Sequence, residues 1–202
     1  MNEDFLLNKA IRTLRFGGLI IYPTETVYGI GVDATNSNAV SKLFEIKKDR
    51  FKPVLIAVNS VEMAKKYVWW NKYADVLAEK YLPGPLSIVL SIKDLNIDER
   101  IYQGGIKIGI RIPRNDFVLK LIGEFGRPIT STSANLPGEK PPINVEEINE
   151  EVKRRVDLII DKGECEVKKP STIVDVSSYP PKLIREGAIS FEEILKVVES
   201  VH

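Results

Sequence analysis

The chain has 202 residues, enough for one substantial domain, and 44% hydrophobic with 28% charged residues indicates a globular protein. Its 29 basic and 28 acidic residues give a net charge of +1, which argues against a generally basic nucleic-acid binder but leaves a local basic groove open. The sequence has one cysteine, and its one histidine is the last residue, His202. We therefore expect no internal disulfide, Ser-His-Asp triad or histidine-based zinc site.

No apolar run approaches the roughly 18 residues that a membrane span needs, and the N-terminus lacks the basic start of a signal peptide. We expect a cytoplasmic protein that does not associate with membranes. The single thiol, Cys165, lies between Glu164 and Glu166, whose charges should raise its pKa. We interpret it as an ordinary surface or loop thiol.

The first half of the chain mixes helical and strand patterns. Apolar spacing predicts a helix over residues 5–16 that stops at Gly17, followed by a buried strand over 19–22. Trp69 and Trp70 are expected to pack in or beside the core. The remaining elements expected here are a helix over 37–47 capped by Ser37, a strand over 54–58, short helices over 60–67 and 71–81, and a strand over 86–92.

The second half continues the mixture without strict alternation, which predicts one α/β domain with a mixed sheet over residues 1–202. A capping box at Ser190 opens the last helix, which runs through residue 201. The other expected elements are an irregular segment over 97–105, a strand over 106–112, a helix over 115–125, a strand over 128–132, a charged helix over 145–155, strands over 157–161 and 172–176 around a loop over 162–170, and a strand over 182–185.

The most informative stretch runs from Ile20 to Gly31, Ile-Ile-Tyr-Pro-Thr-Glu-Thr-Val-Tyr-Gly-Ile-Gly. Pro23 ends the strand, and hydroxyls, a carboxylate and a phenol then follow at its carboxyl end, where open α/β sheets bind ligands. A polar turn explains the same residues equally well. The glycines also fit a loose dinucleotide pattern, but Pro23 and the delayed next helix are the wrong context for it, and the chain has no P-loop.

Three further groups of residues have both a structural and a functional interpretation. The cations at positions 47, 48, 50 and 52 suit either a solvated helix C-terminus or a polyphosphate clamp. The hydroxyls of Ser131, Ser133 and Ser171 suit either turns or ligand contacts. Lys107 and Arg111 share one strand face, and because unpaired buried cations are costly, that face should meet solvent or an anionic ligand.

Four segments in order resemble the YrdC-type threonylcarbamoyl-AMP synthase family. They are residues 23–31, Lys48-Asp49-Arg50 with Lys52-Pro53, residues 131–135 and residues 171–175, and the matched core runs from about 16 to 187. The resemblance implies a YrdC/RibB-like fold, a twisted mixed sheet flanked by helices with a concave basic groove. Larger family members have an extra C-terminal domain, which 202 residues do not accommodate.

The resemblance also implies roles for individual residues. Lys48 and Arg50 match catalytic positions, with Lys47 left open as an alternative, and a histidine that many members carry is replaced near Ala57. The implied ATP-binding residues are Lys48, Arg50, Lys52, Lys107, Ser133, Asn135 and Arg185, and the implied L-threonine-binding residues are Thr26, Arg111, Ser131 and Ser171. No protein side chain is assigned to a metal, and Mg²⁺ is expected with ATP.

The implied reaction makes L-threonylcarbamoyladenylate from L-threonine, bicarbonate and ATP, with release of pyrophosphate. The family makes this compound for N6-threonylcarbamoyladenosine at tRNA position 37, so a separate tRNA threonylcarbamoyl transferase is the expected recipient. Direct RNA binding is expected to be weak. Two alternatives remain, an RNA-binding module of the same fold and a paralogue that acts on a different carbamoyl or acyl substrate.

Overall fold

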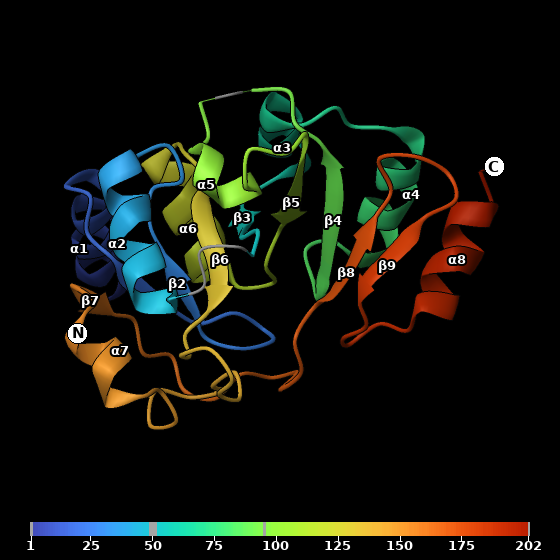
Figure 1. Cartoon of the computed structure of the whole chain (residues 1–202). Coiled ribbons are helices and arrows are strands. Elements are labelled where there is room, and N and C mark those ends of the chain that lie inside the picture. The colour runs from blue at the N-terminus through green and yellow to red at the C-terminus, as the bar shows by residue number, and fades with distance from the viewer. Residues whose placement is uncertain (1, 49–51, 95, 202) are drawn as a thin grey trace.

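One mixed sheet runs through the molecule (Figure 1). The structure is a computed structural model that describes residues 2–48, 52–94 and 96–201. Within these residues nine strands pair in the order β7-β1-β2-β6-β3-β5-β4-β8-β9, with both parallel and antiparallel neighbours, which confirms the predicted α/β fold. The strands are β1 (Ile20–Tyr22), β2 (Gly29–Gly31), β3 (Leu55–Ala57), β4 (Leu86–Ser91), β5 (Lys107–Arg111), β6 (Ile129–Ser133), β7 (Leu158–Ile159), β8 (Thr172–Asp175) and β9 (Lys182–Arg185).

Helices lie at both ends of this sheet and along it. Figure 1 shows α1 and α2 at the end near β7, α6 beside β6, and α4 and α8 at the opposite end near β9; α1 packs on α6, and α4 packs on α8. In the described residues the helices are α1 (Glu3–Arg15), α2 (Ser37–Lys47), α3 (Val61–Tyr67), α4 (Lys72–Tyr81), α5 (Glu99–Tyr102), α6 (Asp116–Phe125), α7 (Glu150–Arg154) and α8 (Phe191–Glu199). None of them is long and apolar enough to cross a membrane.

The glycines of the Ile20–Gly31 stretch belong to a strand that the sequence analysis did not predict. β2 pairs antiparallel with β1, and Gly29 and Gly31 lie against the fully buried ring of Tyr22. A Cβ atom added to Gly31 would come within 2.9 Å of the Tyr22 ring. Close packing of an aromatic ring therefore explains the two glycines, and the dinucleotide pattern is coincidental.

Some predicted boundaries and environments were wrong, for local reasons. The helix expected over 145–155 is limited to α7, because the Asn149 side chain accepts a hydrogen bond from Glu151 N and caps the helix there. The α2 cap is Asn36 instead of Ser37. Trp69 is 63% exposed, and only Trp70 packs beside the core. The segment expected to be irregular contains α5.

Strand β5 brings the candidate site into the middle of the sheet. It lies between β3 and β4, and Ile108 and Ile110 are buried. Its last residue, Arg111, is buried as well. The chain between β7 and β8, residues 160–171, crosses below the sheet from one end toward the other (Figure 1). The β1–β2 loop, the end of β5 and this crossing segment therefore meet at one place.

Candidate functional site

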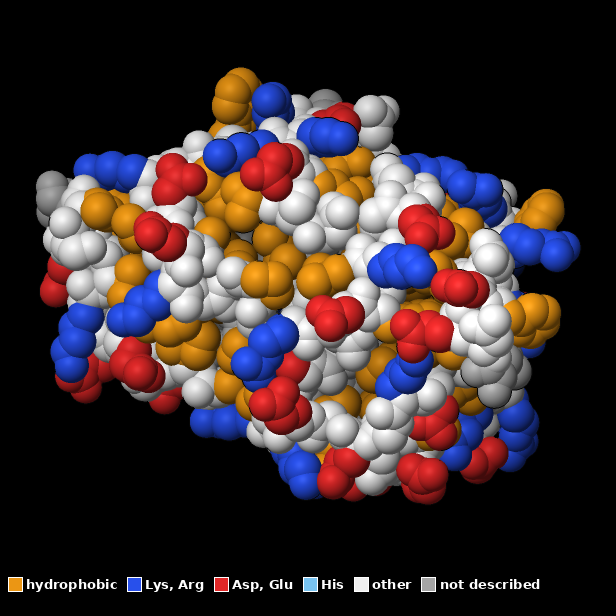
Figure 2. Space-filling view, turned by 180° about the vertical axis from the view of Figure 1, so that it is seen from behind, with side chains coloured by type: hydrophobic (Ala, Val, Ile, Leu, Met, Phe, Trp, Pro, Cys, Tyr) orange, Lys and Arg blue, Asp and Glu red, His pale blue; other side chains and the backbone are white. Residues whose placement is uncertain are grey.

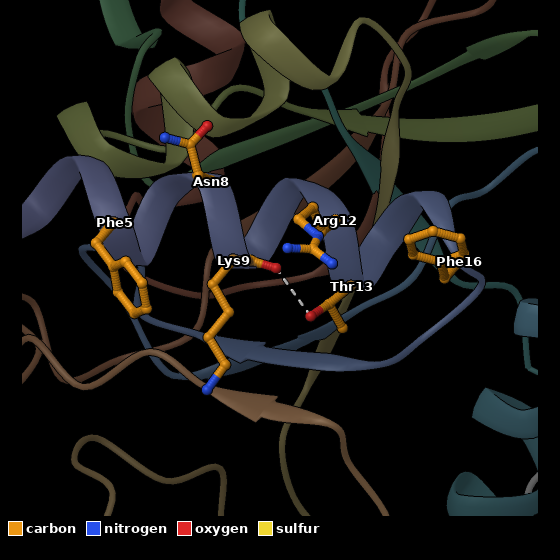
Figure 3. A pocket seen from close by; sticks show the side chains of 6 residues that line it. All are labelled: Phe5, Asn8, Lys9, Arg12, Thr13 and Phe16. Carbon is orange, nitrogen blue, oxygen red and sulfur yellow. Dashed lines mark hydrogen bonds between the residues drawn. The ribbon is translucent and has the colours of Figure 1, made fainter.

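Two hollows in the surface differ in kind. The larger, about 630 Å³, lies on the exposed face of α1, where Figure 3 shows Phe5, Lys9, Arg12 and Phe16 spread along one helix. The hydrogen bond drawn among its residues is local to the helix, from Thr13 to the Lys9 carbonyl oxygen. The smaller, about 40 Å³, lies between the β1–β2 loop, β5, β6 and the chain around β8 and β9, and several of its polar lining residues are buried. Because ligand sites combine a cavity with a few convergent polar groups, we take the smaller hollow as the candidate site.

This smaller hollow, which we call the crevice, collects residues that are far apart in the sequence. It lies between the β1–β2 loop, β5, β6, and the chain around β8 and β9. It is too small to hold a nucleotide, which would have to lie at its mouth. The lining residues are Thr24, Val27, Tyr28, Gly29, Leu55, Arg111, Ser131, Thr132, Ser133, Pro170, Ser171 and Arg185.

Arg111 is held by a buried carboxylate. Its Nη2 atom donates to Glu25 Oε1 at 3.0 Å and to Thr24 Oγ1 at 3.1 Å, and it also contacts Thr26 Oγ1. The second Glu25 oxygen accepts from Arg114 N at 3.0 Å. The exposed fractions of the two side chains are only 6% for Arg111 and 1% for Glu25. Arg111 Nε is also buried but has no partner, so one charge-bearing donor of the guanidinium remains unsatisfied.

The hydroxyls beside Arg111 form an ordered chain. Thr24 Oγ1 donates to the Val27 carbonyl oxygen at 2.7 Å and accepts from the backbone N–H groups of Thr26 and Val27. Since the one hydroxyl hydrogen of Thr24 is used in this way, Thr26 is the donor in the 2.8 Å contact between the two hydroxyls. Thr26 is fully buried behind Arg111 and does not line the crevice.

A second guanidinium enters the crevice from β9. Arg185 Nη2 donates to the Ser171 carbonyl oxygen at 2.9 Å, and Ser171 Oγ lies 2.9 Å from Ser87 Oγ. Although Arg185 is exposed as a residue, its pKa is lowered, first by desolvation of the guanidinium and then by the positive charge of Arg111. Among the described residues no carboxylate pairs with Arg185. The crevice is therefore electropositive and suits an anionic group.

The predicted nucleotide clamp is only partly assembled around this crevice. Lys47 Nζ donates to the carbonyl oxygens of Ser133 and Asn135, at 2.8 and 2.7 Å. Lys48, in contrast, pairs with Glu151 at the surface, 3.1 Å away. Arg50 lies outside the described residues. The lysine that contacts the Ser-x-Asn segment is thus Lys47, the alternative left open by the sequence.

Three other predicted ATP residues do not line the crevice. Lys52 is exposed. Lys107 Nζ pairs with Asp175 at 2.8 Å. Burial raises the pKa of Asp175, but the hydrogen bonds from Lys107 and Ser177 outweigh this effect and lower it. Asn135 turns its amide nitrogen to backbone carbonyl oxygens, while its Oδ1 is buried without a partner. The expectation that the strand face of Lys107 and Arg111 meets solvent or a ligand was incomplete, because each cation has a protein carboxylate.

The segment that crosses below the sheet is tied to the β1–β2 loop. Val167 N donates to the Glu25 carbonyl oxygen, and the Tyr28 hydroxyl donates to the Gly163 carbonyl oxygen, both at 2.7 Å. Burial raises the pKa of Tyr28 to about 12. Cys165 lies in the predicted loop but is buried, so of the two positions expected for it the surface one was wrong. Its pKa is raised to about 11, mainly by burial and only secondarily by nearby carboxylates.

Sequence reasoning assigned no individual role to two residues that shape the site. Glu25 was noticed only as part of a polar turn, and its burial against Arg111 depends on a partner 86 positions away. Ser87 was not noticed, although it interrupts an apolar strand and is fully buried against Ser171. A serine at an inward position of a strand is a usable signal, because a buried hydroxyl requires a hydrogen-bond partner.

Comparison with known families places these residues in context. The Sua5/YciO/YrdC family model, described as "Telomere recombination", matches residues 12–187. The chain belongs to this family. Two relatives are a threonylcarbamoyl-AMP synthase of Pyrococcus abyssi, 35% identical over 98% of this chain, and a putative threonylcarbamoyl-AMP synthase of Methanocaldococcus jannaschii, 38% identical over 89% of it. The chain spans 59% of the Pyrococcus protein and 84% of the Methanocaldococcus protein.

Solved structures share the fold. The crystal structure of P. abyssi Sua5 complexed with L-threonine superposes with a TM-score of 0.91 and 34% identity, covering 98% of this chain and 58% of that one. The crystal structure of Escherichia coli YciO superposes with a TM-score of 0.85 and 27% identity, covering 96% and 94% of the two chains. In coverage, this chain resembles the shorter family members more than full-length Sua5.

Proposed function

We propose that this family member synthesises L-threonylcarbamoyladenylate from L-threonine, bicarbonate and ATP. The observation that carries the proposal is the crevice itself, which the guanidinium groups of Arg111 and Arg185 both line while, among the described residues, only Arg111 pairs with a carboxylate, Glu25. An amino acid's α-carboxylate supplies the counter-charge that is missing there. The L-threonine named in the Pyrococcus structure supports the choice of amino acid.

In this proposal the amino acid occupies the crevice and ATP lies at its mouth. The carboxylate contacts Arg111 and Arg185, while the hydroxyls of Ser131 and Ser171 are placed to contact the amino acid. The nucleotide is proposed to bind beside Ser133 and Asn135, where Lys47 fixes the backbone. Arg50, Lys52, Lys107 and Arg185 remain the proposed phosphate contacts, whereas Lys48 is proposed to stay paired with Glu151, and Mg²⁺ enters bound to ATP.

The proposed chemistry requires little proton transfer from the protein. The neutral amine of threonine condenses with bicarbonate, with loss of water, to form a carbamate, whose anionic oxygen attacks the α-phosphorus of ATP while the bond to pyrophosphate breaks. Positioning and cation contacts can accelerate such an in-line displacement without a histidine base. Glu25 is poorly suited to deprotonate the amine, because both of its oxygens already accept hydrogen bonds from Arg111 and Arg114.

The test measures pyrophosphate release from ATP with and without threonine and bicarbonate. We expect release to require all three substrates, and serine to replace threonine better than valine, which has the same shape as threonine but no hydroxyl. Arg111→Lys should weaken threonine binding roughly tenfold or more, because one ammonium cannot reproduce the planar donors that hold Glu25 and the ligand. Release that is independent of threonine, or equal use of valine, would remove the proposal.

A paralogue with another acyl or carbamoyl substrate is the second candidate. It is favoured by the match to E. coli YciO, an uncharacterised protein of which this chain covers 94% in structure. The same assay separates the two if other amino acids replace threonine as the acceptor. An RNA-binding module has less support: Figure 2 shows basic and acidic side chains interspersed over one whole face, without a broad basic surface there. RNA affinity that falls steeply with salt would revive that alternative.

A further inference from the structure

We propose that Glu25 is a positioning residue that fixes Arg111 and sets the charge of the crevice, so that the site selects an amino acid with a neutral side chain over a dicarboxylic one. The inference rests on the proposed function and names a determinant of its substrate choice. Glu25 does not line the crevice, so it acts through Arg111 and not by touching a ligand.

The first step concerns orientation. Glu25 bridges the Arg111 guanidinium and the Arg114 backbone N–H, with both distances at 3.0 Å. This bridge ties the end of β5 to the β1–β2 loop across 86 residues of sequence. On the guanidinium it engages Nη2, which also contacts the two threonine hydroxyls, and this arrangement leaves the buried Nε without a protein partner. The carboxylate therefore fixes the orientation in which the Arg111 guanidinium lines the crevice.

The second step concerns charge. Arg111 and Arg185 contribute two positive charges and Glu25 one negative charge, which leaves one net positive charge at the crevice. One α-carboxylate balances that charge. A second carboxylate on the ligand would enter a desolvated space without a counter-charge, which is costly. Threonine and aspartate have side chains of similar size, so charge is what distinguishes them at this site.

Two variants separate orientation from charge. Glu25→Asp keeps the charge but is one methylene shorter, so it cannot reach both Arg111 and Arg114; threonine affinity should fall about tenfold while the preference for threonine over aspartate is kept. Glu25→Gln keeps the length but removes the charge, so the preference for threonine over aspartate should fall at least about tenfold. Calorimetric titration with each amino acid, together with the Michaelis constants for threonine and ATP, gives these ratios, and the constant for ATP should change less than twofold.

The matched control is Asp33→Asn, which removes the charge of another buried, arginine-paired carboxylate away from the crevice. It should lower stability without changing either amino acid's affinity. If Glu25→Gln retains the wild-type preference, or Glu25→Asp the wild-type threonine affinity, the inference is overturned. Should Glu25→Gln not fold, the wild type still decides: equal affinity for aspartate and threonine overturns it. If the wild type binds no threonine, the proposed function is overturned as well. If the wild type is active but the Glu25 variants keep its affinities for threonine and aspartate, only this inference is overturned.

Discussion

Two buried acid–arginine pairs, Glu25–Arg111 and Asp33–Arg127, show what distinguishes a site from a structural contact. Both carboxylates are buried, with 1% of each side chain exposed, and the contacts are 3.0 and 2.6 Å. The arginines differ: Arg127 is 45% exposed and lies over the Phe125 ring, whereas Arg111 is 6% exposed. In the first pair a buried donor is left over and a second cation lies nearby.

The difference lies in how completely each pair is satisfied. Asp33 also accepts from the Thr35 backbone N–H and hydroxyl, and its arginine can use water for its remaining donors. Arg111 Nε is buried and unpaired, so it has a free-energy cost that neither a protein group nor bulk water offsets. A buried ion pair thus indicates a binding site when it is incomplete, and not merely because it is buried.

The largest effect is expected from removing the two arginines in turn. Arg111→Met leaves the Glu25 charge buried and unpaired, which should cost about 3–5 kcal/mol of unfolding free energy and abolish threonine binding. Arg127→Met should cost only about 1 kcal/mol of unfolding free energy, because Arg127 is exposed and Asp33 keeps its contacts with Thr35. Urea denaturation and threonine titration measure both. Equal losses in the two variants would contradict the distinction between the pairs.

A second prediction tests the far wall of the crevice. A Cβ atom at Gly187 would lie 2.2 Å from the Pro170 carbonyl oxygen and 2.5 Å from the Ser171 carbonyl carbon, so Gly187→Ala must displace the backbone of a lining residue. We expect threonine affinity to fall about a hundredfold. In the control, Gly126→Ala, the new Cβ meets no atom within 4 Å but the φ angle is +78°, so it should cost about 1 kcal/mol in stability and leave affinity unchanged. Wild-type threonine affinity in the Gly187 variant would show that this wall does not hold the ligand.

The third prediction uses the thiol beside the Glu25–Arg111 pair. The pKa of Cys165 is raised to about 11 from an ordinary value of 9.0, so the folded state holds this proton more tightly than the unfolded state. Its contribution to stability is complete below pH 9 and is lost as the pH rises toward 11, by roughly 2 kcal/mol. When the unfolding free energy is measured by urea denaturation, the wild type should lose about 2 kcal/mol more than Cys165→Ala between pH 8 and pH 10.5. If the unfolding free energies of the two proteins changed equally with pH, the Cys165 thiol would not be desolvated.

The smallest effects separate two adjacent lysines. Lys47→Met removes the ammonium that holds the Ser133 and Asn135 carbonyl oxygens and should raise the Michaelis constant for ATP about tenfold. Lys48→Met removes an exposed pair with Glu151, which should cost less than about 1 kcal/mol in stability and change that constant less than threefold. Steady-state kinetics compares the Michaelis constants of the two variants for ATP. A larger effect at Lys48 would restore its sequence-based role as the principal clamp lysine.

The sequence by itself determined the α/β class, most element positions and the family. Apolar periodicity located α1, because a helix that buries one face must repeat its apolar residues at a fixed spacing, and a capping box located α8. The family resemblance also brought Arg111, Ser131, Ser133, Ser171 and Arg185 to notice, and these five residues do line one crevice. Short-range rules placed the start of α7 too early, because Asn149 caps that helix after its predicted start.

Only the tertiary structure decided which charges are neutralised and which are left over. The partner of Arg111 lies 86 positions away and that of Lys107 lies 68 away, so no local pattern could show that both cations already have carboxylates. The same holds for Cys165, whose acidic neighbours predicted a raised pKa, although burial by the fold is its main cause. The free energy of a charge depends on burial and on the groups around it in space, and both are set by the packing of the whole sheet.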